Sequence, residues 1–178
     1  MRAAISSLHQ NMSARWHLRG TTMVGVVRLD GRAAVTNFGT ITIHDRVRLV
    51  GRTVRLEFDC FKGAEISIGA GTFINYGTNV SAMESVQIGR DCDIGQYSII
   101  MDSDYHDVSD HHLPGKSAPI VIEDDVWLGA RTIVLRGSRI GRGAVIGANS
   151  VVNGVIPPFT LAAGSPARVI RSIGRHND

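Results

Sequence analysis

The stretch IEDDVWLGARTIVLRGSRIGRGAVIGANSVV, residues 122–152, carries an aliphatic residue at every sixth position. These positions are Ile122, Leu128, Val134, Ile140, Ile146 and Val152. A helix repeats its apolar face about every 3.6 residues and a half-buried strand every second residue, so this period fits neither. It is typical of a β-solenoid, in which each hexad adds one short strand to a wall of a prism. Three hexads complete a coil, which predicts that Ile122 stacks on Ile140.

A compact residue follows four positions after each aliphatic one, and we expect both kinds to point inward. The compact residues are Val126, Thr132, Ser138, Ala144 and Ser150. The same pattern recurs upstream at Ile68, Ile74 and Val80, and again at Ile88, Ile94 and Ile100. An ordinary β-sandwich with short strands is the alternative. Six consecutive hexads in register favour the solenoid.

The hexads divide the chain into three parts, and the second contains a loop. The predicted β-helix spans residues 41–156, preceded by an irregular N-terminal segment, residues 1–40. Residues 102–119, DSDYHDVSDHHLPGKSAP, leave the hexad register and are predicted to form a projecting loop. Loops on a rigid scaffold are where functional residues concentrate. Pro157 and Pro158 end the repeat, so residues 157–178 are predicted to be a short C-terminal tail.

Composition narrows the class of protein. The chain has 178 residues, of which 43% are hydrophobic and only 6% aromatic, as a narrow prism requires. A net charge of +3 without a basic cluster argues against nucleic-acid binding. No apolar run is long enough for a membrane span, so we expect a cytoplasmic protein without membrane insertion. Cys92 occupies a compact inward position, which predicts a buried free thiol rather than a disulfide with Cys60.

The segments VWLG, VIGANSVV and AAGSPARVIR together resemble the hexapeptide-repeat acyltransferases. Within that family they are similar to the maltose and galactoside O-acetyltransferases and to polysaccharide O-acetyltransferases. The resemblance covers roughly residues 41–171. It implies an all-β fold, a left-handed parallel β-helix of hexapeptide repeats. It also implies a homotrimer that transfers an acetyl group from acetyl-CoA, with active sites between subunits.

Acetyl transfer to a hydroxyl needs a base, and histidine suits that task near neutral pH. The family carries a histidine where the projecting loop begins, and His106 stands there. His111 and His112 are rival candidates, or else substrate contacts. Asp104 or Asp107 could orient the imidazole, as a carboxylate does in a Ser-His-Asp triad. We predict His106 as the general base and Asp104, Tyr105 and His111 as substrate contacts.

The resemblance assigns four further residues to the site. Asn75 matches an active-site asparagine, although it could equally be a corner residue chosen for its backbone tolerance. Trp127 follows inward Val126, so it should point outward into the groove between subunits, for catalysis, for trimer packing or for both. Ala130 and Ala148 match positions whose backbone groups meet the pantetheine arm of CoA. The Ala130 N–H is also the oxyanion candidate.

Positively charged residues near the end of the repeat are candidates for the CoA phosphates. Arg168 and Arg171 match basic residues near the nucleotide. Asn153 is also predicted to contact CoA, in the stretch where many relatives have Thr-Lys. The missing lysine removes one phosphate contact, which Arg136, Arg139 or Arg142 could replace. The alternative for each arginine is a solvated surface charge.

The predicted function is an acetyl-CoA-dependent O-acetyltransferase that acts on a sugar hydroxyl in surface polysaccharide or glycoconjugate synthesis. One alternative is an N-acetyltransferase acting on an amino sugar or other small amine. Another is a non-catalytic solenoid scaffold. Zinc-binding relatives spread several histidines over adjacent coils, whereas His106, His111 and His112 cluster in one loop. We therefore predict no metal.

Overall fold

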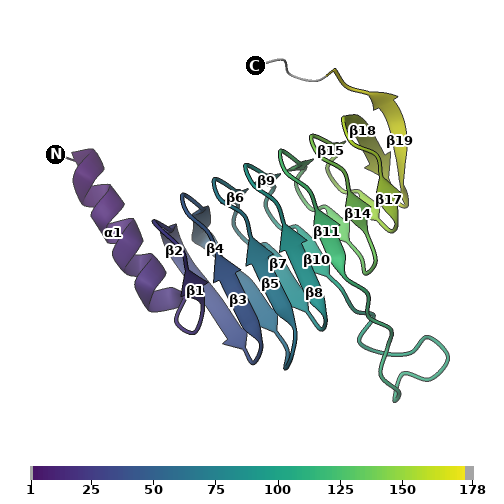
Figure 1. Ribbon diagram of the computed structural model, residues 1–178, viewed down its shortest axis with the longest axis horizontal. Helices are drawn as coiled ribbons and strands as arrows, with labels where there is room; N and C mark the ends of the chain where they lie inside the picture. Colours follow the sequence, from purple (N-terminus) through teal and green to yellow (C-terminus); the bar gives the residue numbers. More distant parts are fainter. Residues whose placement is uncertain (1, 175–178) are drawn as a thin grey trace.

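The hexads form a stack of coils whose walls are ladders of short parallel strands, as the computed structural model in Figure 1 shows. The structure describes the backbone of residues 2–174 and the side chains of residues 10–174. The strands of the first wall are β1 (Thr22–Met23), β3 (Thr40–Ile43), β5 (Glu65–Ile68), β8 (Ser85–Ile88), β11 (Ile120–Ile122), β14 (Arg139–Ile140) and β17 (Val155–Ile156).

The second and third walls belong to one sheet, joined through two long strands that run along both. These are β2 (Arg28–Asn37) and β4 (Arg48–Cys60), which pair in parallel. The second wall continues with β6 (Phe73–Ile74), β9 (Asp93–Ile94), β12 (Trp127–Leu128), β15 (Val145–Ile146) and β18 (Thr160–Gly164). The third wall continues with β7 (Asn79–Ala82), β10 (Ile99–Met101), β13 (Ile133–Val134) and β16 (Val151–Val152).

The core runs along the axis of the stack. Ile122 pairs with Ile140 in the next coil, which confirms the predicted stacking. The five compact residues predicted to point inward are all buried. Cys60 and Cys92 are both buried and free, so the predicted free thiol at Cys92 is confirmed. The all-β class and the parallel solenoid of hexads are likewise confirmed.

The N-terminal end differs from the predicted irregular segment, because regular structure begins well before residue 41. Helix α1 (Arg2–His17) packs on β2, where Ala14 and Leu18, the residue after the helix, are buried. β2 has no hexad period because it is ten residues long and extends over two walls. A solenoid must cover its terminal coil, since an open edge would expose unpaired backbone groups.

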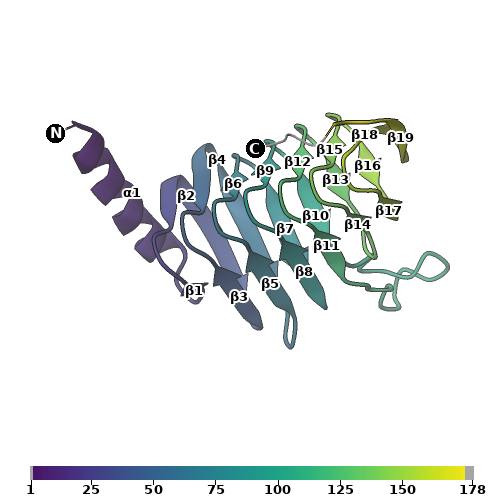
Figure 2. The ribbon, with the colours of Figure 1, turned by 45° about the horizontal axis from the view of Figure 1, so that its top comes forward.

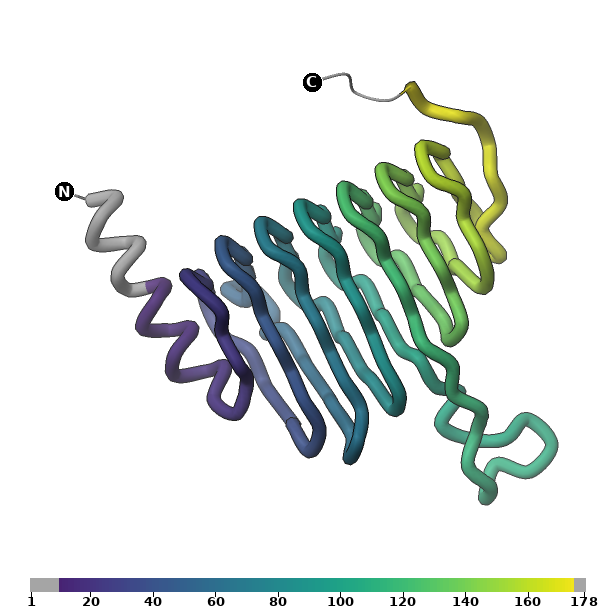
Figure 3. The backbone as a smooth tube through the Cα atoms, in the orientation of Figure 1, coloured from purple at the N-terminus to yellow at the C-terminus, as the bar shows by residue number. Residues whose placement is uncertain are grey.

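The C-terminal end is also covered by regular structure. The predicted tail contains β18 and β19 (Ala167–Ser172), which pair antiparallel, while residues 175–178 lie outside the described residues. The predicted loop leaves after β10, returns at β11 and projects from the stack in Figure 3. Within the described part of the chain, no helix has both the length and the apolar character needed to cross a membrane.

Candidate active site

Four of the predicted site residues line one groove on the outer side of the second wall: Asn75, Trp127, Ala130 and Ala148. Asn75 directly follows β6, and Trp127 begins β12. Trp127 is 56% exposed, as expected for a side chain that points out of the prism. The repeat brings the four residues together because positions one coil apart are neighbours on the same wall.

The groove presents two backbone N–H groups. Among the described residues, neither the Ala130 N–H nor the Ala148 N–H has a hydrogen-bond acceptor. A Cβ atom at Gly95 would lie 2.6 Å from the nitrogen of Ala130, and one at Gly129 would lie 2.6 Å from the nitrogen of Ala148. Gly95 therefore keeps the Ala130 N–H accessible, and Gly129 does the same for the Ala148 N–H. The repeated Ile-Gly pair in the sequence was the signal that could have predicted this role.

Asn75 is held by its neighbours. Its Oδ1 accepts a hydrogen bond from the Tyr76 N–H at 2.9 Å, and its Nδ2 donates to Oε1 of Gln96 at 3.3 Å. Gln96 also lines the groove, and sequence reasoning missed it. Its position in the repeat was the available signal. Gln96 is the second residue after the inward Ile94, as Tyr76 is the second residue after Ile74 in the coil before.

His106 lies on the projecting loop and is exposed. Its Nδ1 is 2.8 Å from the carbonyl oxygen of His111. A carbonyl oxygen only accepts hydrogen bonds, so in the neutral imidazole Nδ1 carries the proton and the lone pair is on Nε2. This tautomer can take up a proton at Nε2. Gly115 allows the two arms of the loop to approach each other closely at His106, because a Cβ at residue 115 would lie 2.7 Å from the backbone nitrogen of His106.

Neither proposed carboxylate orients the imidazole, so those two hypotheses are wrong for this structure. The Asp104 carboxylate instead accepts a hydrogen bond from Nε of Arg136 at 2.6 Å. The Asp107 carboxylate accepts from the backbone and hydroxyl of Ser109, and these hydrogen bonds lower the pKa of Asp107. The His111 backbone carbonyl takes the orienting role because the loop folds back on itself within a few residues.

The predicted substrate contacts occupy the same loop, and each already has a partner within the chain. The Tyr105 hydroxyl hydrogen bonds to the Ser81 hydroxyl. The rings of His111 and His112 lie 4.2 Å apart between centroids. Asp110 joins these two histidines in a group whose ligand atoms lie within 4.8 Å of one another, on an exposed surface. Their roles toward a substrate stay predictions.

A buried carboxylate fixes the root of the loop. Asp102 is 0% exposed and accepts hydrogen bonds from the backbone N–H groups of Met83, Glu84 and Ser85 at 2.7 to 2.8 Å. Its own carbonyl accepts from the Ala118 N–H at 2.9 Å. Asp102 thus joins both ends of the loop to the turn between β7 and β8. The sequence signal was weak, since Asp102 is one of several acids in a polar stretch.

The loop and the groove lie on different edges of the same chain. The loop leaves between the third wall and the first, whereas the groove follows the second wall. In Figures 1 and 2 the loop projects from the lower edge of the stack, while β9 and β15 lie along the upper edge. A single chain therefore does not bring His106 to Asn75 and Trp127.

The predicted CoA residues at the end of the repeat divide into two groups. Arg171 pairs with Leu161, which lines the groove, and Arg168 pairs with neighbouring Ala163. Both arginines are exposed. Asn153 lies between β16 and β17, at the corner from which the loop departs in an earlier coil, and so lies away from the groove.

The arginines considered as replacements for the missing lysine have acidic partners. Arg136 pairs with Asp104, Arg139 with Glu123, and Arg142 with Asp125. All six side chains are at least partly exposed. These arginines therefore serve contacts within and between coils, and a phosphate would have to compete with a carboxylate for each of them.

Comparison with known proteins places the repeat in a family. A family profile described as "Bacterial transferase hexapeptide (six repeats)" matches residues 119–154, which form the coils after the loop. Residues 119–154 thus carry the repeat of the hexapeptide-repeat transferases. The match coincides with the hexads that carry Trp127, Ala130 and Ala148.

Members of the hexapeptide-repeat family with similar sequences include acetyltransferases. The chain is 36% identical over 129 residues to WbbJ of Escherichia coli (strain K12), whose name assigns it to lipopolysaccharide biosynthesis as an O-acetyl transferase. That alignment covers 66% of this chain and 66% of WbbJ. The chain thus spans slightly less than two thirds of the length of WbbJ. It is also 33% identical to the acetyltransferase Rv3034c of Mycobacterium tuberculosis (strain ATCC 25618 / H37Rv). That alignment covers 62% of this chain and 36% of Rv3034c.

Solved structures of similar proteins contain the acyl carrier. The acetyltransferase VCA0836 of Vibrio cholerae, complexed with acetyl-CoA, is 38% identical with a TM-score of 0.60, over 66% of this chain and 65% of that one. A galactoside acetyltransferase in complex with CoA is 31% identical with a TM-score of 0.59, over 67% and 64% of the two chains. This similarity supports the maltose and galactoside branch identified from the sequence.

Proposed function

We propose that this protein transfers an acetyl group from acetyl-CoA to a hydroxyl of a saccharide, with His106 as the general base. The observation that carries the proposal is the 2.8 Å hydrogen bond between Nδ1 of His106 and the carbonyl oxygen of His111. Because Nδ1 donates to the His111 carbonyl, Nε2 is free to accept the proton of an attacking hydroxyl. The acetyl-CoA complex of the similar Vibrio protein supports the choice of acyl donor.

The reaction needs two steps at the thioester. Nε2 of His106 removes the hydroxyl proton as the sugar oxygen forms a bond to the carbonyl carbon. The resulting oxyanion accepts a hydrogen bond from the Ala130 N–H, a donor without a partner among the described residues. The intermediate then breaks its C–S bond, and the imidazolium returns the proton to the sulfur. The products are the O-acetyl sugar and CoA with a free thiol.

The site would form between neighbouring copies of the chain. His106 would come from the loop of one copy, and Asn75, Trp127 and Ala130 from the groove of the next. This arrangement accounts for a loop and a groove that face different directions in one chain. It also gives the exposed Trp127 a partner, since large exposed aromatic side chains commonly mark interfaces.

CoA would lie along the groove with its thioester near Ala130. The Ala148 N–H would meet the pantetheine arm, and Arg171 and Arg168 would lie toward the phosphates beyond Leu161. Asn153 stays a weaker candidate because it lies at another corner. No step of the proposed reaction requires a metal ion.

The first test is thiol release from acetyl-CoA with a panel of sugars. We expect the rate with the best acceptor to fall about 100- to 10,000-fold in His106→Ala, the range typical of a lost general base. His112→Ala tests the rival histidine of the same loop and should leave the rate within a few-fold if His106 is the base. Equal rates in wild type and His106→Ala would overturn the assignment of the base.

A second test addresses the shared site. His106→Ala and Asn75→Ala chains are each expected to have low activity. Mixed assemblies, made by denaturing and refolding the two together, should regain activity, because one interface combines an intact His106 with an intact Asn75. Failure to regain activity in mixed assemblies that form normally would place the whole site within one chain.

A further inference from the structure

The outward side chains of the second wall form a row along the solenoid axis. In-register pairing connects Arg28 to Arg48, Arg48 to Phe73, Phe73 to Asp93, and Asp93 to Trp127. Paired positions on one wall point to the same side of the sheet. These five residues are called the outward row below. Its Phe73, Asp93 and Trp127 line the proposed active-site groove, so the row continues the groove toward the N-terminal end.

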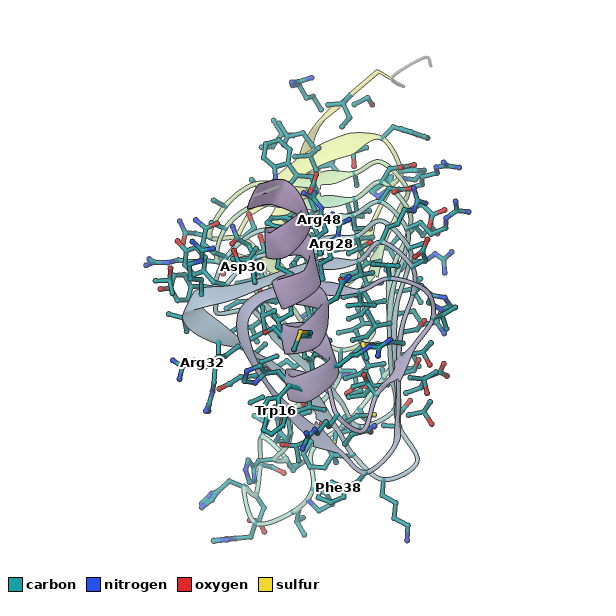
Figure 4. All side chains as sticks on the ribbon, turned by 90° about the vertical axis from the view of Figure 1, so that its left-hand side faces the viewer. Trp16, Arg28, Asp30, Arg32, Phe38 and Arg48 are labelled. Atoms are coloured by element: carbon teal, nitrogen blue, oxygen red, sulfur yellow. The ribbon has the colours of Figure 1, made fainter. Side chains whose placement is uncertain are left out.

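The N-terminal end of the row holds two exposed arginines side by side. No ion pair in the described part of the chain includes Arg28 or Arg48. Asp30, the nearest acid on β2, is instead bound to Arg52 at 2.7 Å. Figure 4 shows Arg28 and Arg48 together on one side of α1, with Asp30 on the other side. Like charges on directly paired positions destabilise a sheet, so this arrangement is one that an anion would stabilise.

Positive charge is also concentrated toward the N-terminal end in the chain as a whole. Before residue 62 the sequence has nine arginines and four acidic residues, whereas from residue 62 onward it has ten basic and twelve acidic residues. The part of the chain before residue 62, which includes α1 as well as the first coils, is thus positively charged, and the remainder is weakly negative. Within the outward row the one acid, Asp93, lies beside Trp127. It would repel an anionic group there and leave the arginine end as the favourable place.

We propose that Arg28 and Arg48 bind an anionic group, a phosphate or a carboxylate, of a saccharide acceptor longer than one sugar. This inference rests on the proposed acetyltransferase function. Strand spacings of about 4.8 Å place Arg48 about 14 Å and Arg28 about 19 Å along the row from Trp127. A hydroxyl near Trp127 and an anionic group at the arginines would therefore belong to different sugar units. Guanidinium groups bind carboxylates and phosphates in a bidentate manner.

Phe73 fits between these two ends. The guanidinium carbon of Arg48 lies 5.1 Å from the centre of the Phe73 ring, which holds the arginine over an apolar surface. The acceptor would contact this ring between the charged end and the reacting end. Along the row, the arginine pair comes first, then the uncharged Phe73 ring, then Trp127. This order fits an acceptor whose charged group lies at one end and whose reacting hydroxyl lies at the other.

The test compares three saccharide probes of equal length by calorimetric titration without acetyl-CoA. The probes are hexagalacturonate, maltohexaose carrying a terminal phosphate, and plain maltohexaose. We expect at least one anionic probe to bind the wild type more tightly than maltohexaose does. In the double variant Arg28→Gln and Arg48→Gln, binding of that probe should weaken about tenfold, and more at low salt, because the attraction is screened by ions. Binding of maltohexaose should not change.

Arg52→Gln is the matched control, because it removes an exposed arginine of β4 that is already paired with Asp30. It should bind the anionic probe as the wild type does. The probe that responds to the double variant identifies the group as carboxylate or phosphate. The proposal is overturned if neither anionic probe binds more tightly than maltohexaose, or if the double variant binds as tightly as the wild type.

The titration also separates this inference from the proposed function. Arginine-dependent binding without acetylation of any acceptor would contradict the acetyltransferase proposal and keep the anion subsite. Acetylation of neutral and anionic sugars with identical KM values in wild type and double variant would contradict the subsite alone. Where acetylation is measurable, the double variant should raise KM for the anionic acceptor and leave kcat unchanged.

Discussion

The coils and the projecting loop are stabilised in different ways. Each coil is bound to its neighbours by parallel backbone hydrogen bonds and by a continuous row of buried aliphatic side chains. The loop, residues 102–119, is mostly exposed, has backbone hydrogen bonds of its own, and is joined to the coils by a few contacts, above all those of Asp102. The groove is thus placed by a repeated, rigid frame, whereas the proposed base is placed by a small number of individual contacts.

Truncating a buried side chain inside a coil is expected to lower the free energy of unfolding far more than truncating an exposed side chain on the loop. Leu128 is 0% exposed and stacks between Ile94 and Ile146. Leu128→Ala should lower the free energy of unfolding by about 2–5 kcal/mol, because it removes buried apolar area and leaves a cavity. Urea denaturation measures this.

The matched control is Val108→Ala on the loop, where the side chain is 97% exposed. It should change the free energy of unfolding by less than about 0.5 kcal/mol. Similar losses in the two variants would mean that the loop contributes to the core as the coils do, and the contrast between the regions would not hold.

The next largest effect concerns the root of the loop. Asp102→Asn keeps one oxygen acceptor and puts an amide NH₂ beside backbone N–H donors, so buried donors lose their partner. The free energy of unfolding should fall by about 1–3 kcal/mol. The rate of acetyl transfer should fall as well, because the loop that carries His106 would be less well fixed.

Asp107→Asn provides the comparison, since its carboxylate caps an exposed turn of the same loop. It should alter stability far less than Asp102→Asn. Unchanged stability and activity in Asp102→Asn would show that the contacts to Met83, Glu84 and Ser85 do not position the loop.

The pKa values of the two regions are shifted in opposite directions. Burial raises the pKa of the Cys92 thiol in the coil to about 12, whereas hydrogen bonds lower the pKa of Asp107 in the loop. The unfolded thiol ionises near pH 8.5. The stability that Cys92 contributes is therefore complete below that pH and is lost as the pH rises toward the folded value.

Relative to Cys92→Ala, the wild type should lose about 1 kcal/mol more of its free energy of unfolding between pH 7.5 and pH 9.5. Urea denaturation at the two pH values measures the difference. An identical pH dependence in the two proteins would mean that the folded thiol ionises as readily as the unfolded one.

The sequence predicted the coils well because their physical rule is local. A six-residue period sets which residue points inward, so the stacking of Ile122 on Ile140 and the exposure of Trp127 followed from spacing. The pairing of Asn75 with Gln96 needed only the step to the next coil. The handedness was not derivable from the period and stays the prediction that the resemblance implies.

The loop and the two ends were predicted less well, because their structure depends on contacts between distant residues. Sequence reasoning considered Asp104 or Asp107 as the group that orients His106, whereas the Nδ1 of His106 is hydrogen bonded to the backbone carbonyl of His111. A backbone acceptor has no signature in residue type. Similarly, β2 departs from the hexad period because it pairs along its whole length with β4, a contact that its own sequence does not show.

The smallest expected effect tests whether surface contacts of the loop matter at all. The Nε of Arg136 lies 2.6 Å from the Asp104 carboxylate, and both side chains are about one third exposed. Arg136→Gln should change the free energy of unfolding by less than about 1 kcal/mol, since water and salt weaken such a pair.

Arg139→Gln on the first wall is the matched control, because it removes an exposed ion pair with Glu123 away from the loop. If the ion pair of Arg136 helps to fix His106, acetyl transfer should fall a few-fold in Arg136→Gln and stay unchanged in Arg139→Gln. Equal activity in the two variants would leave Asp102 as the contact on which the position of the base depends.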